Sequence, residues 1–100
     1  FVSGQLGIDA ASGLIVEGGI QAQTRTALTN LRSVLASAGS SLEQVVKTTV
    51  FLTDMAQFAE MNAVYAEFFT SDFPARSAIQ VAALPKGGIV EVEAIAVLPL

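Results

Sequence analysis

The sequence contains neither cysteine nor histidine, and these two absences exclude several kinds of chemistry. Without cysteine the chain can form no disulfide and carries no thiolate nucleophile. Without histidine it can hold neither a Ser-His-Asp triad nor a zinc site of the usual His/Cys type. Any reaction must therefore use Arg, Lys, Glu, Asp, Ser, Thr, Tyr, backbone groups or water.

Charge is also scarce. There are five basic residues, scattered along the chain, and nine acidic ones, which gives a net charge of −4. This balance does not favour binding to nucleic acid. No apolar run approaches the roughly 18 residues of a membrane span, so we expect no membrane partner. Because nothing indicates an oxidising compartment, the expected location is cytoplasmic.

Apolar residues, in contrast, are abundant. The chain is 52% hydrophobic and only 14% charged, which is more apolar than an average soluble domain. One hundred residues predict a single domain, 1–100. The excess of apolar residues fits either a rich core or apolar surface that is buried between subunits. We favour the second interpretation because large apolar patches on small domains mark contact surfaces.

The hydrophobic pattern predicts alternating strands and helices. We expect strands at 1–9, 14–16, 45–53, 75–84 and 89–98, and helices at 20–38 and 54–69, with Gly39 stopping the first helix. Strand alternation places Val46, Val50 and Leu52 on one face with Thr48. The fold class is therefore α+β, with both helices on one face of a mixed sheet.

Two charged residues do not fit a plain core. Arg76 opens a strand directly after a proline, and its guanidinium could hold a carboxylate through two parallel hydrogen bonds; a solvated arginine at a strand edge is the simpler alternative. Glu91 shares a strand face with Glu93 and three aliphatic residues. It could lie beside a cleft and transfer a proton, or it could be one of two solvated carboxylates. An arginine and a carboxylate on adjacent strand candidates suggest a small anion site.

Three uncharged residues add to this hypothesis. Asn62 lies on the apolar stripe of the second helix, where its amide is either a structural hydrogen-bonding group or a donor to a pocket. Gly4 interrupts the first strand, as a bulge or as a point of close approach for a ligand. Ala78 shares the face of Arg76 and leaves space beside it.

Three segments resemble the YjgF family, which includes the RidA enamine/imine deaminases: FVSGQ (1–5), VVKTTVFLTDMAQFAEMNAVYAEFF (45–69) and FPARSAIQVAALPKGGIVEVEAIAV (73–97). The resemblance covers the whole chain. It implies a chorismate-mutase-like fold that assembles as a homotrimeric barrel with clefts between subunits. The family carries a further strand with a tyrosine ahead of the SGQ segment, so we expect domain 1–100 to lack that N-terminal strand.

The resemblance also implies a function. RidA-like proteins hydrolyse 2-aminoacrylate and related enamine/imine acids to 2-keto acids and ammonia, without metal or organic cofactor. By position, Arg76 matches the arginine that holds the substrate carboxylate and Glu91 the glutamate that activates water. Gly4 and Asn62 match pocket positions, and Ala78 stands where many members have cysteine, so that only its backbone N–H can serve.

Two alternatives remain open from the sequence. A trimer that binds small keto or amino acids without turnover would also need Arg76, although Glu91 favours the enzyme. A ribonuclease or translation inhibitor is a role sometimes attached to the family, but the net charge of −4 and the lack of histidine argue against direct RNA cleavage.

Overall fold

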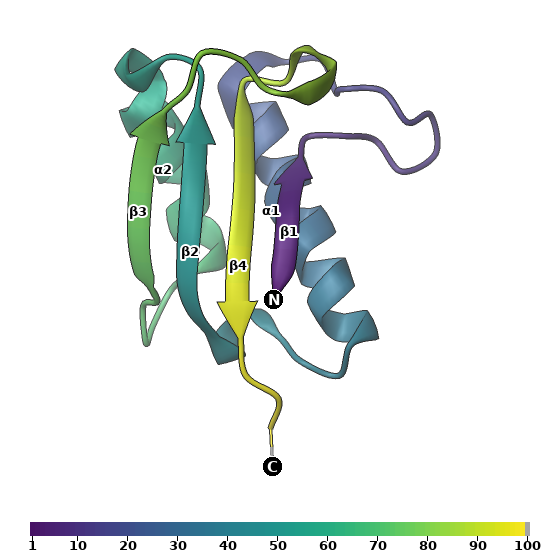
Figure 1. Ribbon diagram of the computed structural model, residues 1–100, viewed down its shortest axis with the longest axis vertical. Helices are drawn as coiled ribbons and strands as arrows, with labels where there is room; N and C mark the ends of the chain where they lie inside the picture. Colours follow the sequence, from purple (N-terminus) through teal and green to yellow (C-terminus); the bar gives the residue numbers. More distant parts are fainter. Residues whose placement is uncertain (100) are drawn as a thin grey trace.

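Two helices pack on one face of a four-stranded mixed sheet in the computed structural model, which describes residues 1–99 (Figure 1). The elements in chain order are β1 (Val2–Leu6), α1 (Gly19–Ser37), the 3₁₀ turn η1 (Leu42–Gln44), β2 (Val45–Leu52), η2 (Met55–Gln57), α2 (Phe58–Phe68), β3 (Ala75–Gln80), η3 (Pro85–Gly87) and β4 (Val90–Ala96). This confirms the predicted α+β class. Among the described residues, no helix is both long and apolar enough to cross a bilayer.

The strand order in the sheet is β1-β4-β2-β3. Strand β4 pairs antiparallel with both β1 and β2, whereas β2 pairs parallel with β3 through the crossover helix α2. Parallel neighbours need such a crossover because a tight hairpin can only reverse the chain. The strand order leaves β3 at one edge of the sheet, and β2 separates it from β4.

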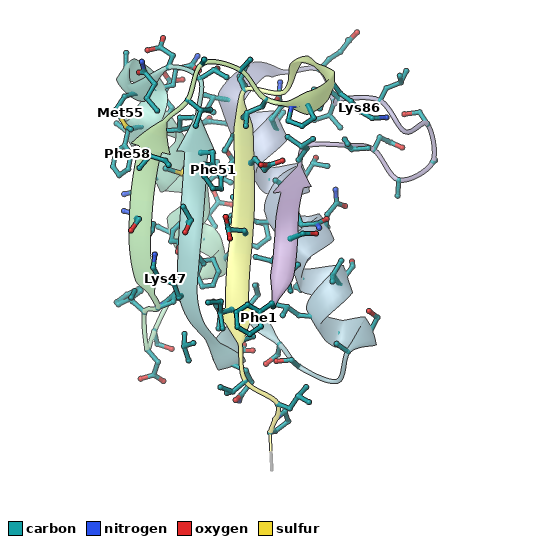
Figure 2. All side chains as sticks on the ribbon, viewed as in Figure 1. Phe1, Lys47, Phe51, Met55, Phe58 and Lys86 are labelled. Carbon is teal, nitrogen blue, oxygen red and sulfur yellow. The ribbon has the colours of Figure 1, made fainter. Side chains whose placement is uncertain are left out.

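Alternation along the strands gives the sheet one covered and one open face. Val50 of β2 and its partner Val92 of β4 are fully buried beneath the helices. Side chains that alternate with the buried ones along each strand point to the other face of the sheet, which no described element covers. Lys47 and Phe51 lie on that face, on the near side in Figure 2. The core thus lies wholly between the sheet and the two helices.

Helix α1 ends as the sequence predicts. Gly39 has a φ of 82°, Ser40 N donates to the carbonyl of Leu35, and Gly39 N donates to that of Ala36. This pair of bonds is a Schellman motif, which requires a left-handed residue at the position that Gly39 occupies. The prediction of Gly39 as the helix stop is confirmed.

Two local predictions were wrong. Residues 14–16 form no strand but only a single bridge between Ile8 and Ile15, because the turn at 9–13 leaves too few residues for a ladder. Val46 is 49% exposed, and the buried residue is Val45 instead. A bulge between Val45 and Lys47 shifts the register against β4. Strict alternation from Thr48 back along the strand therefore predicts the wrong face for Val46.

Candidate active site

Arg76 points from the edge strand toward helix α2. It pairs in parallel register with Thr48, which is completely buried under the helices. Paired residues in neighbouring strands project from the same face. The side chain of Arg76 therefore enters the space between sheet and helix, where it is half-buried.

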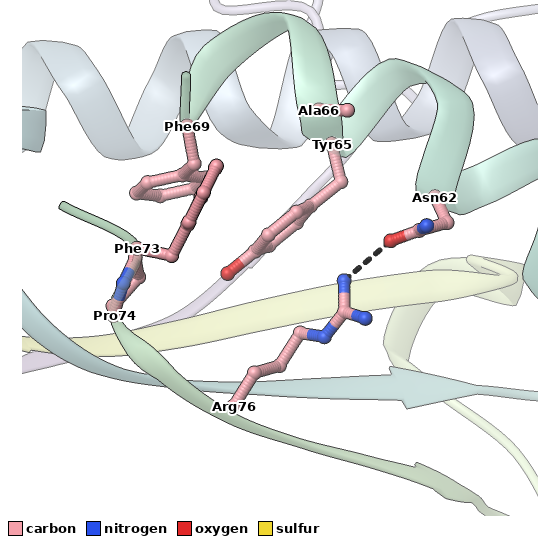
Figure 3. A pocket seen from close by; sticks show the side chains of 7 residues that line it. All are labelled: Asn62, Tyr65, Ala66, Phe69, Phe73, Pro74 and Arg76. Atoms are coloured by element: carbon pink, nitrogen blue, oxygen red, sulfur yellow. Dashed lines mark hydrogen bonds between the residues drawn. The ribbon is translucent and has the colours of Figure 1, made fainter. Parts of the chain in front are cut away.

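Helix α2 holds the guanidinium of Arg76 with three side chains. Its central carbon lies 5.2 Å from the ring centroid of Phe58 and 4.6 Å from that of Tyr65. Nη1 donates to Oδ1 of Asn62 at 2.6 Å (Figure 3). We call Phe58, Asn62 and Tyr65 the arginine clamp. Each cation–π contact contributes about 0.5–2 kcal/mol, depending on its exposure.

The clamp explains why Asn62 interrupts an apolar stripe. Phe58, Asn62 and Tyr65 follow i, i+4, i+7 spacing and thus share one helix face. The faces of the two aromatic rings lie against the cation, while the amide oxygen of Asn62 between them accepts a hydrogen bond from it. Within residues 1–99, no hydrogen bond engages Nε or Nη2 of Arg76. These two groups can bind the two oxygens of one carboxylate.

Tyr65 is itself fixed in the core. Its hydroxyl is 2.8 Å from Oγ1 of Thr48, and its ring packs at 4.6 Å from that of Phe69. Burial raises the pKa of Tyr65, although the hydrogen bond with Thr48 and the positive charge of Arg76 act in the opposite direction. The neutral phenol therefore persists at ordinary pH, and the ring stays a well-defined wall under the guanidinium.

A cavity of about 380 Å³ opens beside the guanidinium of Arg76. It lies between the C-terminal half of α2 and the chain that leads into β3 (Figure 3). Seven residues line it: Asn62, Tyr65, Ala66, Phe69, Phe73, Pro74 and Arg76. One end of the cavity thus carries a fixed cation, and most of the remaining wall is apolar.

Ala78 lies next to Arg76 on the same face of the edge strand, opposite the buried Val50. Val81 N donates to Leu52 O in β2. Because the residues that bond to a parallel neighbour alternate, the N–H of Ala78 is directed to the free edge. It is therefore available to a ligand that Arg76 holds.

Glu91 and Gly4 meet on the other face of the sheet. Glu91 pairs with Phe51, so its half-buried side chain projects to the open face. A Cβ built on Gly4 would lie only 2.5 Å from Cδ of Glu91 and 2.7 Å from its Oε1. Glycine at this position therefore leaves the space that the carboxylate of Glu91 occupies. The neighbouring Glu93 is exposed on the same face.

The expected juxtaposition of Arg76 and Glu91 is wrong within one chain. Strand β2 lies between their strands, and their side chains project from opposite faces of the sheet. The candidate residues thus form two groups. Arg76 and Asn62 line the helix-side cavity and Ala78 shares the strand face of Arg76, whereas Glu91 and Gly4 lie together on the open face.

The sequence pattern does not predict the roles of Phe58, Tyr65 and Thr48. Helical spacing places the two aromatic residues only on the apolar stripe of the second helix, and strand alternation places Thr48 only on a strand face. The sequence does contain an indication of the clamp, because Asn62 lies one helical turn from each ring and this spacing places an amide between two aromatic rings. The sequence alone does not determine the register of β3 against β2, which brings Arg76 beneath these rings.

The chain is similar in sequence and in structure to known proteins. A model of the family described as endoribonuclease L-PSP matches residues 1–98. A 2-iminobutanoate/2-iminopropanoate deaminase of Bos taurus is 55% identical over 97 residues, which are 97% of this chain and 71% of the relative. A Thermotoga maritima structure, provisionally described as an endoribonuclease, superposes with a TM-score of 0.95 at 46% identity, covering 99% of this chain and 78% of that one. The Escherichia coli protein TdcF with bound serine gives 0.91 at 41% identity, with 97% and 78% covered.

Proposed function

Since the chain belongs to the endoribonuclease L-PSP family, the YjgF family to which its sequence is similar, we propose that it hydrolyses reactive 2-enamine/2-imine acids to 2-keto acids and ammonia. The observation that carries this proposal is the clamped Arg76, which lines a cavity of ligand size and whose Nε and Nη2 make no hydrogen bond within residues 1–99. The substrate class agrees with the name of the bovine relative, a 2-iminobutanoate/2-iminopropanoate deaminase.

In this proposal Arg76 holds the substrate carboxylate through two parallel hydrogen bonds. The arginine clamp restrains the guanidinium before the substrate arrives, so that little side-chain entropy is lost on binding. The outward N–H of Ala78 gives the carboxylate a further donor. The carbon next to the carboxylate, which is the electrophilic carbon of the imine, is thereby fixed in position.

We assign the activation of water to Glu91 of a neighbouring subunit. One chain cannot bring its own Glu91 to its own Arg76, because the sheet separates them. A closed ring of three chains joins two different surfaces of each subunit at every interface. The open face with Glu91 and Gly4 of one subunit then meets the edge strand with Arg76 and Ala78 of the next, which forms three equivalent clefts in a homotrimer.

The proposed reaction needs only positioning and proton transfer. Glu91 takes a proton from water as the oxygen forms a bond to the imine carbon, the C=N electron pair moves to the nitrogen, and Glu91 passes this proton to the nitrogen. Glu91 then takes the hydroxyl proton of the resulting carbinolamine as the oxygen electrons form the C=O bond, the C–N bond breaks, and ammonia leaves with that proton. The 2-keto acid remains. Proton transfer by a placed carboxylate typically contributes about 10²–10⁴-fold.

Turnover with matched variants tests the proposal. An amino-acid oxidase generates the 2-imino acid, and semicarbazide traps what the protein has not hydrolysed. We expect Arg76→Ala to abolish suppression of the trapped signal and Glu91→Gln to lower kcat by about 10²-fold or more. Glu93→Gln is the control, because Glu93 shares the strand and face of Glu91 and is exposed. Full activity of Glu91→Gln would contradict the assigned role.

Mixed trimers test whether the site is shared between subunits. Co-expressed Arg76→Ala and Glu91→Gln chains, each inactive alone, form an intact cleft wherever the first provides Glu91 and the second provides Arg76. Random assembly in a three-fold ring then restores roughly a quarter of the wild-type sites. A site within one chain would restore none.

The alternative is a trimer that binds keto or amino acids without turnover. The same arginine supports it, and the bound serine of TdcF shows that a relative holds an amino acid. Wild-type protein that binds 2-oxobutanoate but does not suppress the semicarbazide signal would establish this alternative. Ribonuclease activity, which the family description names, has no supporting feature here, since basic residues are few and histidine is absent.

A further inference from the structure

The cavity beside Arg76 extends well past the guanidinium. In Figure 3 the Tyr65 side chain lies between the Arg76–Asn62 pair on one side and Phe69 with Phe73 on the other. Beyond Tyr65 the lining changes from polar to apolar, with Ala66, Phe69, Phe73 and Pro74. We call these four residues, together with the Tyr65 ring, the apolar end of the cavity.

We propose that the apolar end receives the side chain of the substrate, and that the preferred substrates are 2-imino acids with a branched aliphatic or aromatic side chain. This inference rests on the proposed function, because it takes Arg76 as the anchor of the carboxylate. Tyr65 then has two contacts with the substrate region. Its ring supports the guanidinium and also forms the near wall of the side-chain pocket.

The size of the cavity supports a large side chain. A closed apolar cavity of about 150 Å³ already accommodates benzene, and the cavity here has about 380 Å³. The volume therefore takes a carboxylate, the imine group and a phenyl or isobutyl group together. The methyl or ethyl group of a small imino acid would leave most of the apolar wall in contact with water.

The exposure of Phe73 supports the same assignment. Its side chain is 73% exposed, although that of Phe69 in the same lining is only 4% exposed. Phe69 is held by its contact with Tyr65 at the end of α2. Phe73 precedes Pro74, which limits its backbone to extended conformations. One lining ring is therefore fixed in the core, and the other presents an aromatic surface that an apolar ligand would cover.

Filling the pocket from helix α2 tests the proposal. Ala66 lines the cavity and is exposed, whereas Ala63 is another exposed alanine of the same helix that does not line it. Ala66→Phe places a ring in the apolar end, and Ala63→Phe is the matched control for helix propensity and surface change. The two substrates are the imines that an amino-acid oxidase makes from phenylalanine and from 2-aminobutanoate.

We expect the wild type to have the higher kcat/KM for the phenylalanine-derived imine. A single methylene in an apolar pocket changes this ratio by about 10–200-fold, so Ala66→Phe should lower kcat/KM for the larger imine by at least roughly 10-fold and that for the smaller by no more than about 3-fold. Ala63→Phe should change neither. Equal losses for both imines in Ala66→Phe, or a wild-type preference for the smaller imine, would overturn the proposal.

Binding separates a failure of this inference from a failure of the proposed function. If the wild type hydrolyses neither imine, the deaminase assignment fails, and calorimetric titration with phenylpyruvate and 2-oxobutanoate still tests the pocket. Tighter binding of phenylpyruvate that Ala66→Phe weakens by roughly 10-fold supports the side-chain pocket. Equal affinities, or affinities that Ala66→Phe leaves unchanged, refute it.

Discussion

The buried hydrogen bond between Tyr65 and Thr48 gives the sharpest test of how the core supports the site. Its two oxygens are 2.8 Å apart, Thr48 has no exposed surface, and Tyr65 is 7% exposed. Tyr65→Phe keeps the ring that carries Arg76 but leaves the Thr48 hydroxyl without this partner. Thr48→Val likewise leaves the Tyr65 hydroxyl without this hydrogen-bond partner. An unpaired buried polar group costs about 1–3 kcal/mol, so each single variant should lose that much free energy of unfolding.

The double variant should lose far less than the sum of the two. With both hydroxyls replaced by apolar groups no polar atom of the pair remains unpaired, and such an exchange is nearly neutral, up to about 1 kcal/mol. The four proteins form a double-mutant cycle. Its coupling free energy, which is the difference between the loss in the double variant and the sum of the two single losses, is therefore expected to be about 1–3 kcal/mol.

Urea unfolding of the four proteins measures these free energies. All four must be compared at one protein concentration, because the proposed homotrimer would make apparent stability depend on it. The slope of the unfolding free energy against urea should stay constant, which shows that only stability has changed. Additive losses in the double variant would refute the reasoning, since the two hydroxyls would then contribute to stability independently.

Three further predictions concern pH, the carboxylate of Glu91 and the surface. Burial raises the pKa of Tyr65, so the stability that this group contributes is fully present below its unfolded pKa of about 10 and is lost as pH rises through the folded value. Tyr65 is the only tyrosine, so the ultraviolet absorbance of tyrosinate follows it alone; equal midpoints in folded and urea-denatured protein would contradict the shift. Gly4→Ala should displace the Glu91 carboxylate and lower kcat by roughly 10-fold or more, while the free energy of unfolding falls by less than about 1 kcal/mol because only the flexible end of a side chain must move; unchanged kcat in the semicarbazide assay would separate Gly4 from catalysis. Glu67→Gln breaks a pair with Arg25 in which both side chains are at least half exposed, so urea unfolding should show a loss below about 1 kcal/mol, and a larger loss would mean that the pair is buried in the assembly.

The sequence by itself determined what depends on neighbouring residues along the chain. The absence of cysteine and histidine limits the chemistry, and the stripe of α2 already contains Asn62 at the centre of an aromatic face. Alternation in β4 separates Glu91 from the buried Val92 without reference to any other strand. These inferences are robust because helical and strand periodicity is local geometry.

Only the tertiary structure decided which of these groups meet. The insertion of β2 between β3 and β4 and the parallel register of Arg76 with Thr48 depend on contacts between residues far apart in the chain. Alternation tells which residues of one strand share a face, but it does not tell which face the helices cover. Arg76 and Glu91 consequently looked like neighbours in the sequence and lie on opposite faces of the sheet. The same non-local packing formed the arginine clamp, because it brought α2 over the edge strand.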